Sequence, residues 1–181
     1  MKRHLMAALL CATTFASSAV LAQNIGTTPQ TLDLSGGSDF FGDTFAANNG
    51  GATFADQFTF TVTGTEPLNL AAVVASNSFT GATGLGITGL SLYDTTGGTV
   101  VTSGTSQNSG ALDVWTLTSA NLAAGSYYLQ VSGNVVSDES TSFGGAVSLV
   151  PVPEPETYGM MLGGLGILAW LARRRRGGGR I

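Results

Sequence analysis

The chain has 181 residues, of which 43% are apolar and only 10% are charged, so it has room for one domain between its hydrophobic ends. All seven basic residues lie near the two ends, whereas the eleven acidic residues lie between them, and the formal net charge is -4. Because the central region is purely anionic, it repels phosphate backbones and anionic headgroups, and we expect no nucleic-acid binding.

Residues 1–22 have the pattern of a secretory signal peptide. A short basic head, Lys2 and Arg3, precedes the apolar run LMAALLCATTFA, and small residues follow, ending in VLA. This pattern predicts cleavage between Ala22 and Gln23, and a buried helix of a cytosolic protein is the alternative. Cleavage would remove Cys11, the only cysteine, so the exported protein would have neither a disulfide nor thiol chemistry.

Residues 23–150 are predicted to form a single all-β domain. Apolar and polar residues alternate in TFADQFTFTV and again in SYYLQVSG, and helical periodicity is absent. The stretches GLSLYDTTGGTVVTSG and ALDVWTLTSANLAAGSYYLQVSG each read as two strands joined by a short loop. Further strands are expected near residues 31–34, 39–45, 68–75 and 145–150. About nine short strands favour a β-sandwich of jelly-roll type.

The side chains of this domain restrict its chemistry. Residues 23–172 contain no histidine, cysteine, lysine or arginine. A Ser/His/Asp triad, a thiol nucleophile, a phosphate clamp and a zinc site with imidazole or thiolate ligands therefore cannot be built. We expect a non-enzymatic protein. A carboxylate glycosidase remains open, because such an enzyme needs only two acids about 5 to 10 Å apart.

Asp56 is unusual because the alternation places its carboxylate on the same face as Phe54, Phe58 and Phe60. A buried carboxylate is costly unless it is satisfied, and the domain has no cationic side chain that could pair with it. Backbone N–H and hydroxyl groups could surround it, it could be protonated, or it could ligate Ca²⁺ through oxygen atoms alone. A carboxylate that caps a turn or bulge at a strand end is the simpler structural interpretation.

Two further features leave a binding function open. Asp33, Asp39 and Asp43 in LSGGSDFFGD offer oxygen ligands, but the segment does not match an EF-hand, and solvated loop acids are the alternative. An exposed Tyr128 or Trp115 could bind glycans, whereas aromatic residues of a sandwich usually belong to its core. A carbohydrate- or calcium-binding module is therefore the alternative to a structural protein.

Residues 151–181 combine three kinds of segment. Residues 151–157 are rich in proline and glutamate, residues 158–172 form an apolar stretch, and residues 173–181 open with Arg173, Arg174, Arg175 and Arg176. At 1.5 Å per residue, a helix of about 15 residues spans about 22 Å of a roughly 30 Å hydrocarbon core. We expect a short transmembrane helix, with the arginines as a stop-transfer signal on the cytoplasmic side. A permanent tail anchor is the alternative to a transient signal.

Val152, Pro153, Glu154 and Pro155, followed by the apolar helix and the arginines, resemble the PEP-CTERM sorting signal of Gram-negative bacteria that make exopolysaccharide. In that family the membrane protease-transpeptidase exosortase processes the signal. The resemblance implies transient passage through the inner membrane and final placement at the cell surface or in the biofilm matrix. The partners it implies are exosortase and exopolysaccharide, and no catalytic residue or cofactor comes with it. The GGGRI extension departs from the usual pattern.

Two weaker resemblances lie within the domain. The segment FADQF, with Phe54, Asp56 and Phe58, is similar to the FxDxF motif that names one family of PEP-CTERM proteins. The segments GLSLYD and AAGSYYLQVSG resemble strands of bacterial pre-peptidase C-terminal β-sandwich domains. The second resemblance implies a fold only.

Overall fold

The structure is a computed structural model that describes residues 23–77, 84–152 and 155–176. These residues form ten strands and one helix. The elements are β1 Gln30–Thr31, β2 Ser38–Phe45, β3 Thr53–Val62, β4 Leu68–Asn77, β5 Leu85–Asp94, β6 Thr99–Ser103, β7 Thr105–Asn108, β8 Leu112–Leu122, β9 Gly125–Val135, β10 Thr141–Pro151 and α1 Pro155–Arg176.

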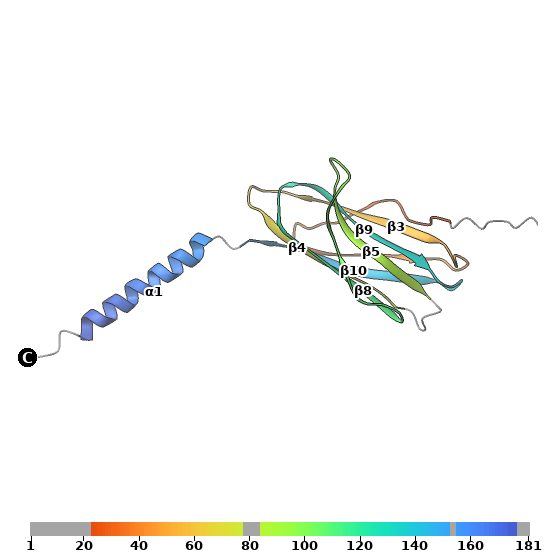
Figure 1. Ribbon diagram of the computed structural model, residues 1–181. Coiled ribbons are helices and arrows are strands. Elements are labelled where there is room, and N and C mark those ends of the chain that lie inside the picture. The colour runs from red at the N-terminus through yellow and green to blue at the C-terminus, as the bar shows by residue number, and fades with distance from the viewer. Residues whose placement is uncertain (1–22, 78–83, 153–154, 177–181) are drawn as a thin grey trace, which may run out of the picture.

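Two five-stranded sheets pack face to face (Figure 1). The first has the order β1-β3-β9-β5-β6 and the second the order β2-β10-β4-β8-β7. Strands β2 to β5 alternate between the two sheets, and all pairs are antiparallel except β1 with β3. The predicted β-sandwich is confirmed, whereas the jelly-roll type remains a prediction.

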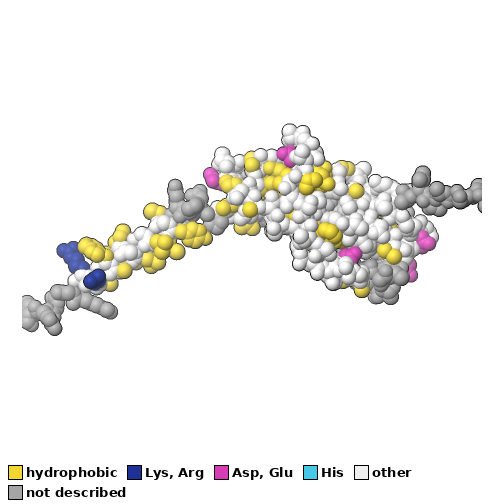
Figure 2. Space-filling model, in the orientation of Figure 1, with side chains coloured by type: hydrophobic (Ala, Val, Ile, Leu, Met, Phe, Trp, Pro, Cys, Tyr) yellow, Lys and Arg dark blue, Asp and Glu magenta, His cyan; other side chains and the backbone are white. Residues whose placement is uncertain are grey.

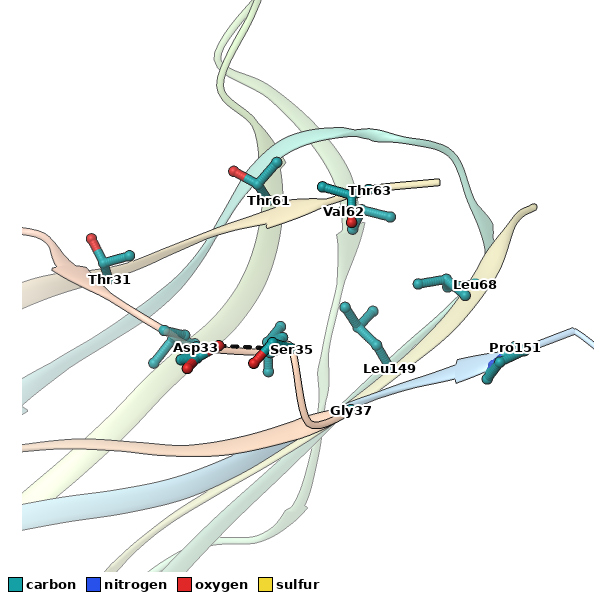
Figure 3. A pocket seen from close by; sticks show the side chains of 12 residues that line it. Thr31, Asp33, Ser35, Gly37, Thr61, Val62, Thr63, Leu68, Leu149 and Pro151 are labelled. Carbon is teal, nitrogen blue, oxygen red and sulfur yellow. Dashed lines mark hydrogen bonds between the residues drawn. The ribbon is translucent and has the colours of Figure 1, made fainter. Parts of the chain in front are cut away.

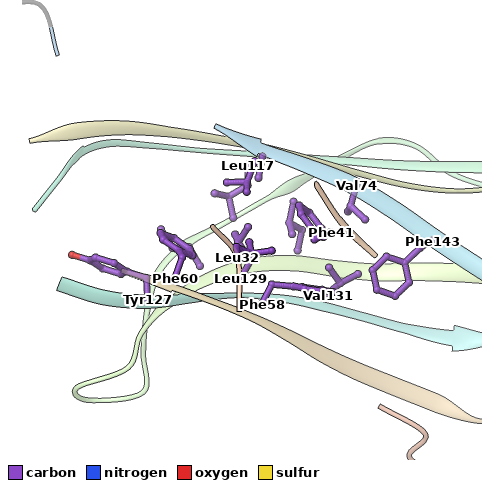
Figure 4. Packing of buried hydrophobic residues seen from close by; sticks show 14 of the residues in the cluster. Leu32, Phe41, Phe58, Phe60, Val74, Leu117, Tyr127, Leu129, Val131 and Phe143 are labelled. Carbon is purple, nitrogen blue, oxygen red and sulfur yellow. The ribbon is translucent and has the colours of Figure 1, made fainter. Parts of the chain in front are cut away.

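The alternation read from the sequence builds the core between the sheets. In β3, the inward side chains from Phe54 to Val62 are buried at every second position, and Phe58 is fully buried. Aromatic rings from both sheets meet there, and Phe41 and Phe58 have centroids 4.9 Å apart (Figure 4). Phe54 stacks on Phe143, with centroids 5.4 Å apart. Such pairs add to the free energy gained from burial alone.

The prediction misses one strand, β7, and makes the first strand too long. All four residues of β7 are polar and exposed, so no alternation marks it. The chain passes from the first sheet to the second between β6 and β7, at Gly104. A Cβ atom at Gly104 would lie 2.7 Å from the carbonyl oxygen of Thr116, so the crossing needs a residue without a side chain.

The expected helix over residues 158–172 lies within α1, which extends away from the sandwich (Figure 1). The expectation that it crosses a membrane is not supported, because no helix among the described residues is long and apolar enough to do so. Four glycines interrupt its apolar residues, and four arginines occupy its last turn. The expected signal peptide, residues 1–22, lies outside the described residues.

Candidate functional site

Asp56 lies in the middle of β3, with 1% of its surface exposed. The Thr27 N–H donates a hydrogen bond of 2.7 Å to its Oδ1, and the Thr27 hydroxyl lies 3.4 Å from the same oxygen. Thr27 belongs to the N-terminal segment, residues 23–29, which runs beside β3 and is held there by the Ile25 N–H on the Thr53 carbonyl at 2.9 Å. Backbone and hydroxyl donors thus satisfy one oxygen. The strand-end cap is wrong, because β3 pairs with β9 around Asp56 in unbroken register.

A second F-x-D-x-F sequence, FGDTF, lies in β2 on the opposite sheet and was not predicted from the sequence. Its phenylalanines meet those of β3 across the core. Phe41 lies 4.9 Å from Phe58, and Phe45 lies 4.7 Å from Phe54, as measured between ring centroids. Asp43 stands between Phe41 and Phe45 and therefore faces its counterpart in β3. We call Asp43 and Asp56 the aspartate pair.

Each member of the aspartate pair has a buried Oδ2 atom without a hydrogen-bond partner. Burial raises the pKa of Asp56, the hydrogen bonds from Thr27 oppose this rise, and the charge of Asp43 and a side-chain hydrogen bond with it add to it. Ionised carboxylates only accept hydrogen bonds, so two such oxygens become partners only when a proton lies between them. The geometry favours protonation among the alternatives left open for Asp56.

Acidic side chains do not gather into a larger cluster. In the part of the chain that the structure describes, no group of three or more His, Cys, Asp or Glu residues could hold a metal ion. Ca²⁺ takes six to eight oxygen ligands, whereas phenylalanine rings flank the aspartate pair. Asp39 accepts the Asp33 N–H at 2.8 Å and the Phe40 N–H at 2.8 Å, which fits a loop acid that holds its own backbone.

A pocket of about 490 Å³ lies at the end of the sandwich where β10 leads to α1 (Figure 3). Leu68, Leu149 and Pro151 line it together with several threonines, and Asp33 is the one acid among its described lining residues. Hydrogen bonds from Ser35, one of them the backbone N–H at 3.0 Å, lower the pKa of Asp33. A glycosidase needs a second carboxyl group and an acid with a raised pKa, and the described residues that line this pocket supply neither.

The outer face of the first sheet carries a pair of stacked aromatic rings. Tyr93 and Tyr128 lie opposite each other on β5 and β9, with centroids 4.8 Å apart and ring planes at 2°. Beside them, the Gln57 amide donates to that of Gln130 at 3.5 Å. Trp115 is partly buried and packs against the core, and its Nε1–H donates to the Ile87 carbonyl at 3.1 Å. Tyr128 was predicted as an exposed aromatic residue, but Tyr93 was not, because only strand pairing brings it there.

The sorting segment begins at the edge of the sandwich. The Val152 N–H lies 3.4 Å from the Pro67 carbonyl oxygen. Pro153 and Glu154 lie outside the described residues, and Pro155 begins α1. Hydrophobic side chains are distributed along α1 among other atoms, and basic side chains lie at its far end (Figure 2). The predicted stop-transfer residues, 173–176, end α1, and the Arg174 guanidinium lies 5.6 Å from the Trp170 ring centroid.

No curated protein shows significant similarity to this chain. Among solved structures, the pre-peptidase C-terminal domain of a collagenase from Bacillus anthracis is 15% identical, covers 71% of this chain and 95% of its own, and has a TM-score of 0.37. PliG, a periplasmic inhibitor of g-type lysozyme from Aeromonas hydrophila, is 13% identical, covers 71% and 99%, and has a TM-score of 0.40. Neither likeness is close enough to support an argument.

The profile of the PEP-CTERM protein-sorting motif matches residues 151–176. This range holds the proline-rich residues, α1 and the four arginines on which the resemblance was based. The motif implies export, surface sorting and processing by exosortase. The similarity of FADQF to the FxDxF family remains a prediction. The chain therefore carries a PEP-CTERM protein-sorting motif over residues 151–176.

Proposed function

We propose that this chain is an exported, non-enzymatic β-sandwich protein that exosortase delivers to the cell surface or the exopolysaccharide matrix. The match of the sorting motif to residues 151–176 carries this proposal. The composition of the body supports it, because residues 23–172 contain no imidazole, thiol, amine or guanidinium group for catalysis. In this proposal the sandwich is the part of the protein that is delivered, and the sorting motif directs its delivery.

In this proposal α1 enters the inner membrane for a short time only. Its large apolar side chains are exposed; Met160 is 79% exposed and Trp170 60%. Exposed large apolar side chains on a helix favour contact with apolar surroundings. The arginines at its end hold that end among the cytoplasmic headgroups. The apolar stretch of residues 158–172 is shorter than the hydrocarbon core, and this mismatch disfavours a permanent span.

Exosortase would cut near residues 153–156, just outside the membrane. Proline lacks a backbone N–H and keeps the preceding residue extended, so the prolines of PVPEPE favour a backbone open to a protease between the end of β10 and the start of α1. Cleavage there, together with removal of residues 1–22, separates the sandwich from every arginine. The released body is purely anionic, which suits a hydrated matrix that divalent cations bridge.

The test uses one epitope inside the body and one after Ile181, followed in cells that have an exosortase. We expect the body epitope outside the inner membrane, separated from the second epitope. Replacing Pro153, Glu154 and Pro155 with alanine should leave the full-length precursor in the membrane. The matched control replaces Glu66 and Pro67, a Glu-Pro pair in a turn of the sandwich, and should be processed normally. Both epitopes on one molecule in the inner membrane at steady state would show a simple tail anchor instead.

A second candidate function, glycan binding, is supported by the stacked pair Tyr93 and Tyr128. Sugar rings pack on aromatic faces, and neighbouring amide and hydroxyl groups can bind their hydroxyls. Replacing both tyrosines with alanine should abolish retention of the protein on exopolysaccharide from the producing cell. Phe40→Ala, at an 83% exposed aromatic on the other sheet, is the control. Equal retention of all three proteins would remove this site from consideration.

A further inference from the structure

We propose that the aspartate pair shares one proton, and that this proton fastens β2 and the N-terminal segment to the core of the sandwich. Loss of the proton then loosens this edge of the molecule while the rest of the two sheets stays closed. The proposal is independent of the sorting route, because it concerns only contacts within the sandwich. It also gives the two F-x-D-x-F sequences a common physical role.

The hydrogen bonds orient both carboxyl groups in the same way. The Thr27 N–H holds Oδ1 of Asp56 at 2.7 Å, and the Thr44 N–H holds Oδ1 of Asp43 at 2.6 Å. Each residue therefore has one satisfied oxygen and one buried, unpartnered oxygen. A proton on either Oδ2 donates to the other and satisfies both atoms. Without it, two unpaired acceptors of like charge stand together in the interior.

Phenylalanine rings enclose the pair, and two glycines make room for them. Phe54 lies opposite Gly133 on β9, and Phe41 lies opposite Gly145 on β10. A Cβ atom at either glycine would collide with the ring beside it, so both rings lie flat against bare backbone. The same arrangement thus occurs on both sheets. The rings give the two Oδ2 atoms apolar surroundings, in which an uncompensated charge is costly.

No other charged group compensates the pair. Neither β1, β10 nor residues 23–29 contain a titratable side chain, and residues 23–172 contain no cationic one. On β9, Tyr127 donates its hydroxyl to the Ala123 carbonyl, and Tyr128 lies on the outer face. On β2, Asp39 accepts backbone N–H groups of its own loop. Asp43 is the only titratable group that contributes to the raised pKa of Asp56.

The direction of the pH effect follows from that shift. The pKa of Asp56 in the folded protein lies above its value in the unfolded chain, so the folded state binds the proton more tightly. The resulting stabilisation is fully present at pH values below the pKa that Asp56 has in the unfolded chain. It is lost as the pH rises through the pKa that Asp56 has in the folded protein. This is opposite to the contribution of an aspartate held by a cation, which is lost on acidification.

Asparagine tests the proposal, because its amide N–H replaces the shared proton permanently. The melting temperature of the purified full chain would be followed between pH 4 and pH 9. We expect the melting temperature of the unmodified protein to fall more with rising pH than the melting temperature of Asp43→Asn or Asp56→Asn. At the alkaline end both variants should be the more stable proteins. The proposal fails if either variant has the same pH profile as the unmodified protein.

Asp113→Asn is the matched control. Asp113 is also buried, at 6% exposure, but backbone N–H groups of Gly110 and Ile87 bind its two oxygens, each at 2.8 Å. An amide there turns an N–H toward another donor, so this variant should melt at a lower temperature at every pH. If the variants of the aspartate pair lose stability in the same way, the shared proton is refuted. A full recovery of the unmodified protein at pH 9 on adding CaCl₂ would also refute it and indicate a cation site.

Hydrogen exchange tests where the loosening occurs. Protection factors, corrected for the intrinsic effect of pH, should fall at the alkaline end for the Thr27 amide and for the amides of β2. The amides of β5 and β8, far along each sheet from this edge, should keep their protection. In Asp56→Asn the loss at β2 should disappear. A uniform loss over all strands would show global destabilisation and would contradict a local fastening.

Discussion

Neighbouring phenylalanines in β2 show how one residue step decides what a side chain contributes. Phe40 points outward and is 83% exposed, whereas Phe41 points into the core and is 7% exposed. Of the two, only Phe41 contacts the β3 aromatic residues, with its ring 4.9 Å from that of Phe58. Two adjacent phenylalanines therefore differ greatly in the free energy that each gains from burial on folding.

We expect Phe41→Ala to lower the free energy of unfolding by about 3–5 kcal/mol, the usual cost of an aromatic truncation in a core. Phe40→Ala should change it by less than about 0.5 kcal/mol, because an exposed side chain loses little on truncation. Urea unfolding of both variants measures the difference. Similar losses for the two would mean that the strand lies in the other register, with Phe40 inside.

The sequence predicts the inward face of β3 correctly but does not reveal its partner. Alternation places Asp56 among phenylalanines because every second position of TFADQFTFTV is apolar or aspartate. In β2 the adjacent Phe40 and Phe41 hide the same pattern around Asp43. Which strand of one sheet faces which strand of the other depends on the connections between sheets, and periodicity carries no information about them.

Among the secondary-structure elements, α1 extends beyond its apolar stretch at both ends. The expected helix covered residues 158–172, whereas α1 runs over Pro155–Arg176. Proline is favoured in the first turn of a helix, and arginine is a good helix former, so the helix extends through both flanks. Its glycines limit its apolar surface, because they carry no side chain. The space around them is open: a Cβ atom added at Gly159, Gly163, Gly164 or Gly166 would meet nothing within 4 Å.

This open space predicts that α1 can be converted into a stable anchor. Replacing Gly163, Gly164 and Gly166 with leucine adds apolar surface without a steric clash. In cells without exosortase, we expect the triple leucine variant to resist extraction from membranes by alkaline carbonate more than the unmodified chain does. The corresponding triple alanine variant separates hydropathy from helix propensity and should be extracted like the unmodified chain. Complete resistance of the unmodified chain would contradict a weak, transient insertion.

For the whole molecule, charge and fold are divided between separate segments. The sandwich holds together by packing and backbone pairing, and no cysteine lies in residues 23–181. Its class is predictable, because short alternating strands and glycine-rich turns are typical of a sandwich. The sequence does not predict the passage of the chain between sheets at Gly104 or the all-polar strand β7, because both depend on contacts with distant strands.

The absence of basic residues from the body has a consequence that does not depend on folding. Trypsin cleaves only after lysine or arginine, because the acidic group in its specificity pocket must be paired with a cation. Residues 4–172 contain neither, so the whole sandwich should survive as one fragment that ends at Arg173, even when urea has unfolded it. Resistance to trypsin that came from folding would disappear in urea, whereas resistance that comes from the absence of lysine and arginine remains.

Chymotrypsin provides the control, because its apolar pocket accepts the phenylalanines, tyrosines and leucines that fill the core of the sandwich. In the same urea solution it should reduce the body to small peptides, which shows that the chain is unfolded and accessible. Intact-mass measurement of the tryptic product should then give a single species containing all eleven acidic residues and both edges of each sheet. Tryptic fragments that end inside residues 23–172 would mean that the body carries cleavable positions, and that its purely anionic character, on which the proposed matrix placement rests, is wrong.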